Sequence, residues 1–149
     1  MSIAEDIAAI QAVNLTISGV VSAPDGTTTP IPSQVEAADL PMVLAWPGAF
    51  ELESAARNVL DGTRVYQLAF LLAGESDGVG ITENVLKVWD FLTKARATWI
   101  DYAVMGAPLN GGQVVAHYHD EGGQTVMLAY RGRTWAGFLA RLEVWEPGL

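Results

Sequence analysis

A chain of 149 residues fits one domain, and because half of its residues are hydrophobic it can bury a core and is not disordered throughout. It has no cysteine, which excludes a disulfide scaffold, a zinc ribbon and thiol catalysis. The formal net charge is −9 and the Lys and Arg residues occur singly, which argues against direct binding to nucleic acid.

The first ten residues, MSIAEDIAAI, carry two acids and no base, so they lack the pattern of a signal peptide. No apolar run approaches the ~20 residues that a membrane span requires. We therefore expect a protein that is made in the cytoplasm and does not contact a membrane.

The N-terminal region predicts one helix. Ile3, Ile7 and Ile10 recur at helical spacing, which predicts a short amphipathic helix over residues 3–13 with this apolar stripe in the core. Residues 15–21, LTISGVV, are compatible with a strand, although the glycine within them weakens it.

The next part of the chain predicts a loop, two strands and an arm. Residues 22–39 contain three prolines and a run of threonines, which predicts a long surface loop. Residues 40–46 and 63–73 have the apolar, alternating composition of strands. We expect these two strands to be antiparallel and joined by a long polar arm between residues 50 and 62.

A glycine-rich linker leads to the main helix, predicted over residues 82–100. Its stripe of Val85, Trp89, Leu92 and Trp99 is typical of packing rather than of a cofactor site. Three further strands are predicted over residues 113–119, 125–130 and 135–145, separated by polar turns.

This order of elements predicts the fold class. Helix, strands, helix and strands follow one another without βαβ alternation. We therefore predict a single α+β domain over residues 1–149, with a mostly antiparallel sheet and with an N-terminal helix and one longer helix packed on one face.

Both histidines of the chain lie in one short stretch, VVAHYHDEGG. On a strand, His117 and His119 would point to the same face and could chelate one metal ion. The spacing matches the first piece of a cupin metal motif, but the Glu and the later His that this motif requires are missing. We interpret the stretch as a strand entering a turn, and we expect no metal.

Other catalytic motifs are missing from the sequence. No serine lies in a G-x-S-x-G pattern, and there is neither a Walker loop nor a G-x-G-x-x-G motif. We therefore predict a protein that is not an enzyme and has no cofactor.

The order of the segments resembles that of the tail-terminator, or tail-completion, proteins of long non-contractile-tailed phages, over most of the chain. The segments that carry the resemblance are DLPMVLAW, the returning strand TRVYQLAFLLAG, the helix ITENVLKVWDFLTKAR and the closing stretch YRGRTWAGFLARLEVWE. The Pro- and Thr-rich loop over residues 22–39 and the glycine-rich insertion around residues 106–112 depart from the shorter members of the family.

This resemblance implies a structural protein of the virion, at the head-proximal end of the tail. Such proteins form a six-fold ring on the end of the tail tube, stop its polymerisation and offer a surface to the head–tail connector. The partners expected from the resemblance are further copies of the chain in a hexameric ring, the tail tube protein and the connector protein. DNA would pass through the channel without specific binding.

The resemblance also places the subunit and tube contacts in the arm and in the turn before the last strand. The residues expected there are Glu51, Glu53, Arg57, Asp61, Arg64, Arg131 and Arg133.

Three alternatives stay open. A head–tail connector or neck protein, or a tube-like tail protein, shares the same pattern of elements. From a different class, a small cupin-like metal-dependent enzyme would rest on His117 and His119 alone. A small-ligand binding domain would rest on the five Trp residues, which are spaced like packing residues.

Overall fold

The computed structural model describes residues 3–48, 63–74, 81–101, 104–105, 114–120, 122, 126–130 and 133–145. The predicted arm and most of the predicted linker lie outside these ranges. The elements, in chain order, are α1 (Ile3–Asn14), η1 (Ala37–Asp39), β1 (Met42–Pro47), β2 (Thr63–Gly74), α3 (Ile81–Asp101), β3 (Val104–Met105), β4 (Val114–Asp120), β5 (Val126–Tyr130) and β6 (Arg133–Trp145).

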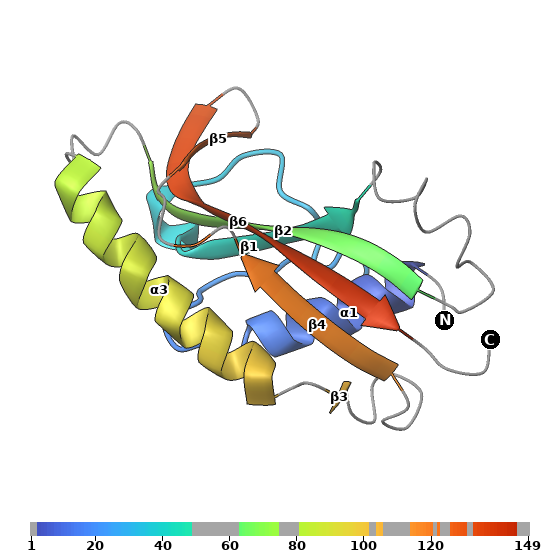
Figure 1. Ribbon diagram of the computed structural model, residues 1–149. Coiled ribbons are helices and arrows are strands. Elements are labelled where there is room, and N and C mark those ends of the chain that lie inside the picture. The colour runs from blue at the N-terminus through green and yellow to red at the C-terminus, as the bar shows by residue number, and fades with distance from the viewer. Residues whose placement is uncertain are drawn as a thin grey trace.

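The strands form one sheet in the order β1-β2-β6-β4-β3, and all of these pairings are antiparallel. The central strand is β6. One of its sides pairs with β2, and its other side pairs first with β5 and then with β4. Both helices lie on the same face of this sheet (Figure 1). The predicted α+β fold with helices on one face is confirmed.

The main core lies between the sheet and the two helices. Phe70 of β2 and Phe138 of β6 stack at its centre, with 4.3 Å between ring centroids and 10° between ring planes. Alternate residues of the two strands continue this core, as the period of two requires. They are Tyr66, Leu68, Phe70 and Leu72 of β2, and Phe138, Ala140, Leu142 and Val144 of β6.

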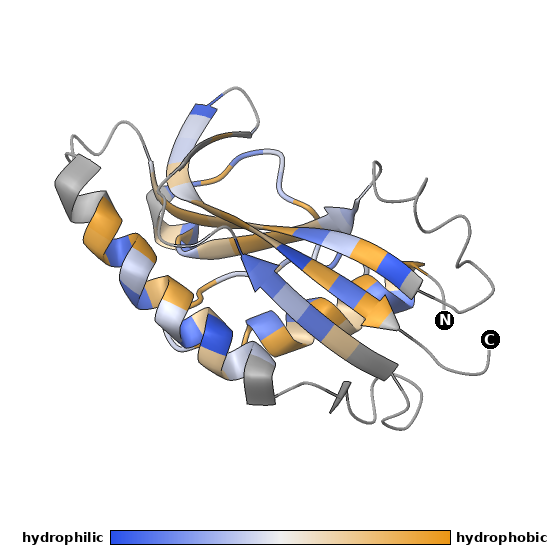
Figure 2. Cartoon of the chain, in the orientation of Figure 1, coloured by the Kyte–Doolittle hydropathy of each residue, from blue (hydrophilic) through white to orange (hydrophobic). Residues whose placement is uncertain are grey.

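A second, smaller core covers only half of the opposite face. There the loop over residues 22–39 and the β5–β6 hairpin close over the sheet, and the hydroxyl of Tyr130 donates to the carbonyl of Pro32 at 2.9 Å. Figure 2 shows that β2 is continuously apolar in this half, that β6 begins hydrophilic and becomes apolar toward the centre of the sheet, and that both strands alternate in hydropathy in the half beside β4. Among the described residues, no second core covers this face in the half beside β4, and His117 and His119 are exposed there; we call this the open half of the sheet.

The buried faces of both helices differ from the predicted stripes. Ile3 and Trp89 were expected in the core, but each is 52% exposed. Leu92, Trp99 and Ile10 are buried as predicted. The described part of α3 also buries Val88, Phe91 and Ala95, and α1 also buries Asp6, Ala9, Gln11 and Asn14. The prediction failed in α1 because it counted only apolar residues, whereas three of the five buried side chains are polar. Among the described residues, no helix is both long and apolar enough to cross a membrane.

The predicted strand over residues 15–21 is wrong, while the loop predicted after it is confirmed. The chain continues in turns after α1, and the N–H of Leu15 donates to the carbonyl of Gln11 at 3.0 Å. Gly19 has a φ of 93°, and a Cβ there would lie 3.2 Å from the ring of Phe91. This left-handed conformation breaks the extended path that a strand requires.

The outer edge of β1 is closed by polar contacts. At Val43, the backbone N–H donates to the carbonyl of Ser22 at 2.9 Å, and the carbonyl accepts the side-chain amide of Gln11, also at 2.9 Å. Farther along the strand, Pro47 has no N–H to offer. A further strand would have to displace these contacts to pair here.

The buried polar residues of α1 form a hydrogen-bonded chain from β1 to α3. Gln11, which is 1% exposed, also donates to the carbonyl of Pro24 at 2.9 Å. Its oxygen accepts the amide of Asn14 at 2.9 Å, and the oxygen of Asn14 accepts the indole N–H of Trp99 at 3.1 Å. These contacts pair polar groups whose burial would otherwise be unfavourable.

We expect the substitution Gln11→Leu to lower the free energy of unfolding by about 3 kcal/mol, although it makes the core more hydrophobic, because it leaves several buried polar groups unpaired. The fully buried neighbour provides a comparison, since Ile10→Val should cost only about 1 kcal/mol. Urea unfolding followed by circular dichroism measures both. A Gln11→Leu effect no larger than that of Ile10→Val would contradict the role given to this network.

Gly137 of β6 lies where β2 leaves no room for a side chain. A Cβ there would lie 1.7 Å from the carbonyl oxygen of Phe70, beside the register shift between Leu71 and Ala73. We expect Gly137→Ala to cost about 3 kcal/mol or to prevent folding, because the backbone itself would have to move. The substitution Gly122→Ala provides a comparison, because it introduces backbone strain without a steric clash. Its φ is +84° but nothing lies within 4 Å, so it should cost about 1 kcal/mol in the same unfolding experiment.

Candidate functional site

Polar side chains form a row across the open half of the sheet. The register pairs Trp46 of β1 with Gln67 of β2, Gln67 with Arg141 of β6, and Arg141 with His119 of β4. Side chains at paired positions lie on the same face with about 4.5–5.5 Å between their Cβ atoms. Four strands therefore bring an indole, an amide, a guanidinium and an imidazole together.

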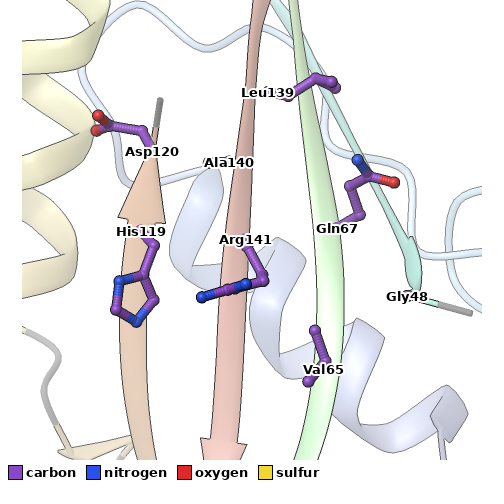
Figure 3. Close-up of a pocket in the computed structure, with 8 residues that line it drawn as sticks. All are labelled: Gly48, Val65, Gln67, His119, Asp120, Leu139, Ala140 and Arg141. Atoms are coloured by element: carbon purple, nitrogen blue, oxygen red, sulfur yellow. The ribbon is translucent and has the colours of Figure 1, made fainter. Parts of the chain in front are cut away.

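A hollow of about 240 Å³ lies over this row (Figure 3). Its polar lining comes from Gln67, Arg141 and His119, and from one acid, Asp120. Figure 3 shows the carboxylate of Asp120 turned away from Arg141. The rest of the lining is small or apolar and consists of Gly48, Val65, Leu139 and Ala140.

A hydrogen bond sets the orientation of the Gln67 amide. The indole N–H of Trp46 donates to the amide oxygen of Gln67 at 3.2 Å. The oxygen of Gln67 therefore faces β1 and its nitrogen faces β6, as Figure 3 shows. A side-chain amide has two N–H donors on its nitrogen, so Gln67 presents donors toward the β6 side of the hollow.

Two arginine–carboxylate pairs near the hollow differ in strength. Arg96 of α3 holds Asp120 through two hydrogen bonds of 2.9 and 2.7 Å, and the Asp120 side chain is almost fully buried. Arg141 contacts Glu143 at 3.3 Å, and these side chains are 38% and 36% exposed. The first pair has the short bidentate geometry of strong pairs, whereas the second is a long, solvent-screened contact.

The Arg96–Asp120 pair affects the pKa of two groups, Asp120 itself and Tyr118, which packs against Trp99 on the helix-covered face of the sheet. The hydrogen bonds from Arg96 hold the pKa of Asp120 below its usual range, and the N–H of Gly122, at 3.0 Å, acts in the same direction. Burial raises the pKa of Tyr118, and the charge of Asp120 raises it further. Asp120 thus stays ionised and Tyr118 stays protonated near neutral pH, which makes neither suited to proton transfer there.

The histidines lie where a strand was predicted. His117 and His119 are exposed on β4 and share one face, and His117 pairs with Glu143 in the register. Within the described ranges, no group of three or more His, Cys, Asp or Glu residues could hold a metal ion. Two imidazoles alone are an incomplete set of ligands for a zinc site.

Most of the residues predicted to contact a neighbour lie outside the described ranges. These are Glu51, Glu53, Arg57, Asp61 and Arg131. Of the other two, Arg133 is exposed at the start of β6. Arg64 turns toward the helices, and its side chain, 20% exposed, forms an ion pair with the buried Asp6. Tyr66 donates to the same carboxylate, and burial followed by this hydrogen bond raises the pKa of Tyr66.

Comparisons of the chain with models of known protein families, with curated proteins and with solved structures gave no match. The geometry of the open face and the order of the elements are therefore the basis for any functional argument.

The sequence analysis missed Gln67, Arg141 and Glu143 as members of a site. Alternation along each strand was a usable signal, because Gln67 lies opposite in phase to Tyr66 and Leu68, and Arg141 to Leu142. Alternation does not reveal which strands are neighbours. The pairing of β6 with both β2 and β4, which creates the row, could not be derived from it.

We expect the Arg96–Asp120 pair to stabilise the fold in a pH-dependent way. The folded pKa of Asp120 lies below its unfolded value, so the contribution is complete above that unfolded value, about 4, and is lost as the pH falls below it. At pH 7, Asp120→Asn should lower the free energy of unfolding by about 2 kcal/mol.

The measurement is the free energy of unfolding from pH 2 to pH 7 for the wild type and Asp120→Asn. The difference between them should shrink as the medium becomes acidic. The comparison is necessary because hydrogen bonds from Thr29, Thr27 and Thr28 also lower the pKa of Asp25, and this carboxylate titrates in both proteins. A difference that stays constant with pH would show that the charge of Asp120 does not contribute.

Proposed function

We propose that this chain is a structural subunit of a phage tail, of the terminator kind. It forms a ring on the end of the tail tube, stops polymerisation of the tube and provides the surface that joins the head connector. The order of elements, which resembles that family over most of the chain, is the first support. The observation that carries the proposal is an open polar half-face of the sheet next to the base of a long inserted arm.

The arm begins beside the hollow. Gly48, the last described residue before it, lines the hollow, and its N–H donates to the carbonyl of Val65 at 3.0 Å. The chain is described again from Thr63, at the start of β2. The described residues on either side of the predicted arm, Gly48 and Thr63, therefore belong to the same end of the β1–β2 pair, and we expect the arm to contact a neighbouring subunit.

A closed ring requires a head-to-tail contact between two different surfaces of the same subunit. The sheet offers such a difference, because the helices cover one face and the half beside β4 leaves the other face open. The net charge of −9 is compatible with a channel through which DNA passes without binding. A neck protein or a tube-like subunit would use the same surfaces, so the experiment has to separate these roles.

We expect light scattering over a concentration series to show a rise in mass from one copy to a closed ring. Electron microscopy of the same sample, mixed with tubes of the tail tube protein from the same genome, should show caps at one end of each tube. A neck protein would form rings that ignore tube ends, and a tube-like subunit would extend the tubes. A monomer at every concentration that never binds a tube end would contradict the proposal.

A matched pair of variants tests the predicted interface. Arg57→Gln removes a charge from the arm, whereas Lys87→Gln removes the same charge from the exposed surface of α3. Arg57→Gln should raise the concentration needed for assembly by about threefold, and Lys87→Gln should leave it unchanged. Equal effects of the two variants would argue against a contact through the arm.

A further inference from the structure

We infer that the row of Gln67, Arg141 and His119 is a binding site for a carboxylate group. In the ring, this carboxylate belongs to an Asp or Glu side chain of a neighbouring copy of the chain, a step that rests on the proposed function. The geometry points to a carboxylate because three donors of different kinds line the same hollow from three adjacent strands.

The donors match the two oxygens of a carboxylate. Arg141 supplies a planar guanidinium, the group that pairs with carboxylates most specifically. On one side of it, Gln67 turns its amide nitrogen toward β6, because its oxygen accepts the indole N–H of Trp46. On the other side, the ring of His119 lies at the register position paired with Arg141. Figure 3 shows a ring carbon toward Arg141, and a half-turn of the ring about its Cβ–Cγ bond would bring a nitrogen to that side.

The surroundings favour an added negative charge. Among the described residues that line the hollow, the one acid is Asp120, which Arg96 holds on the α3 side and which points away from Arg141 in Figure 3. The remaining lining includes Val65 and Leu139, and apolar walls strengthen a charge-assisted hydrogen bond by excluding water. A site with this composition attracts an anion more strongly than an open surface does.

The carboxylate of Glu143 is a weak competitor for this position on Arg141. Glu143 contacts Arg141 at 3.3 Å, whereas a strong pair of this kind has a separation of about 2.7–2.9 Å. The Arg96–Asp120 pair meets that standard in the same protein. An incoming carboxylate that reaches the hollow can therefore replace a long contact by shorter ones.

The size of the hollow indicates what carries the carboxylate. About 240 Å³ is below the ~300–1,000 Å³ of sites for drug-sized ligands and cofactors, but it can hold one short acidic side chain. The chain has 17 Asp and Glu residues against 8 Lys and Arg residues, so another copy offers many acids and few other sites that favour them. A second copy is thus the occupant that the charge balance favours.

Titration of the purified chain with acetate, at constant ionic strength kept with chloride, tests the site by nuclear magnetic resonance. We expect saturable shifts in the side-chain N–H signals of Gln67 and Arg141. The substitution Arg141→Gln should abolish the shift in the Gln67 signals. Glu143→Gln should tighten acetate binding by about threefold, because it removes the competing carboxylate.

Two control variants make the same changes of charge away from the hollow. Lys87→Gln matches Arg141→Gln, and Glu36→Gln matches Glu143→Gln, and both control residues are exposed. Neither should alter acetate binding. Shifts that do not saturate, that persist in Arg141→Gln, or that tighten equally in Glu36→Gln would overturn the site.

Assembly measured by light scattering then identifies the source of the carboxylate. If a neighbouring copy provides it, acetate and Arg141→Gln both weaken ring formation, and Lys87→Gln does not. Rings that form in the wild type without acetate binding would overturn the site and leave the proposed function intact. Saturable acetate binding by a chain that never assembles would overturn the ring and the neighbouring copy as the source, and would assign the site to a free carboxylate.

Discussion

The antiparallel pairing of β2 with β6 is the interaction on which the rest of this structure depends. It places two long strands at the centre of the sheet, and their alternating side chains serve two purposes. One phase builds the core that the helices cover, with the stacked rings of Phe70 and Phe138 at its centre. The other phase is apolar where the second core covers it and polar where the sheet is open, and there it sets Gln67 beside Arg141. A shift of one residue in this register would exchange the two sets of side chains.

The position of α1 depends on polar groups as much as on apolar burial. Gln11 and Asn14 connect the helix to β1 and to Trp99 of α3, and Asp6 holds Arg64 and Tyr66 of β2. Such contacts are directional, whereas hydrophobic burial is not. They therefore fix the rotation of the helix about its own axis, which explains why Ile3 lies outside the core although it continues the apolar stripe.

Local patterns predicted much of this fold, and the failures have physical reasons. Every strand predicted from residue 40 onward is found within about two residues of its expected ends, because alternation is a local signal. The facing of Arg64 toward the helices could also have been predicted, since it shares its phase with Tyr66. The hollow could not be predicted, because it depends on which strands are neighbours. The turns after α1 were mistaken for a strand because apolar composition does not distinguish a strand from turns that contain a left-handed glycine.

The closed edge of β1 has a consequence for growth. Sheets extend from one molecule to the next when an edge strand offers unpaired backbone groups. On β1 the side chain of Gln11 and the backbone of Ser22 already occupy Val43, and Pro47 has no N–H to offer. Strand-by-strand extension from this side of the subunit would have to displace the contacts at Val43 and would find no donor at Pro47. A protein proposed to end a tail tube must not polymerise through its own sheet edges. On this edge the buried side-chain amide of Gln11 and the missing N–H of Pro47 both oppose such pairing.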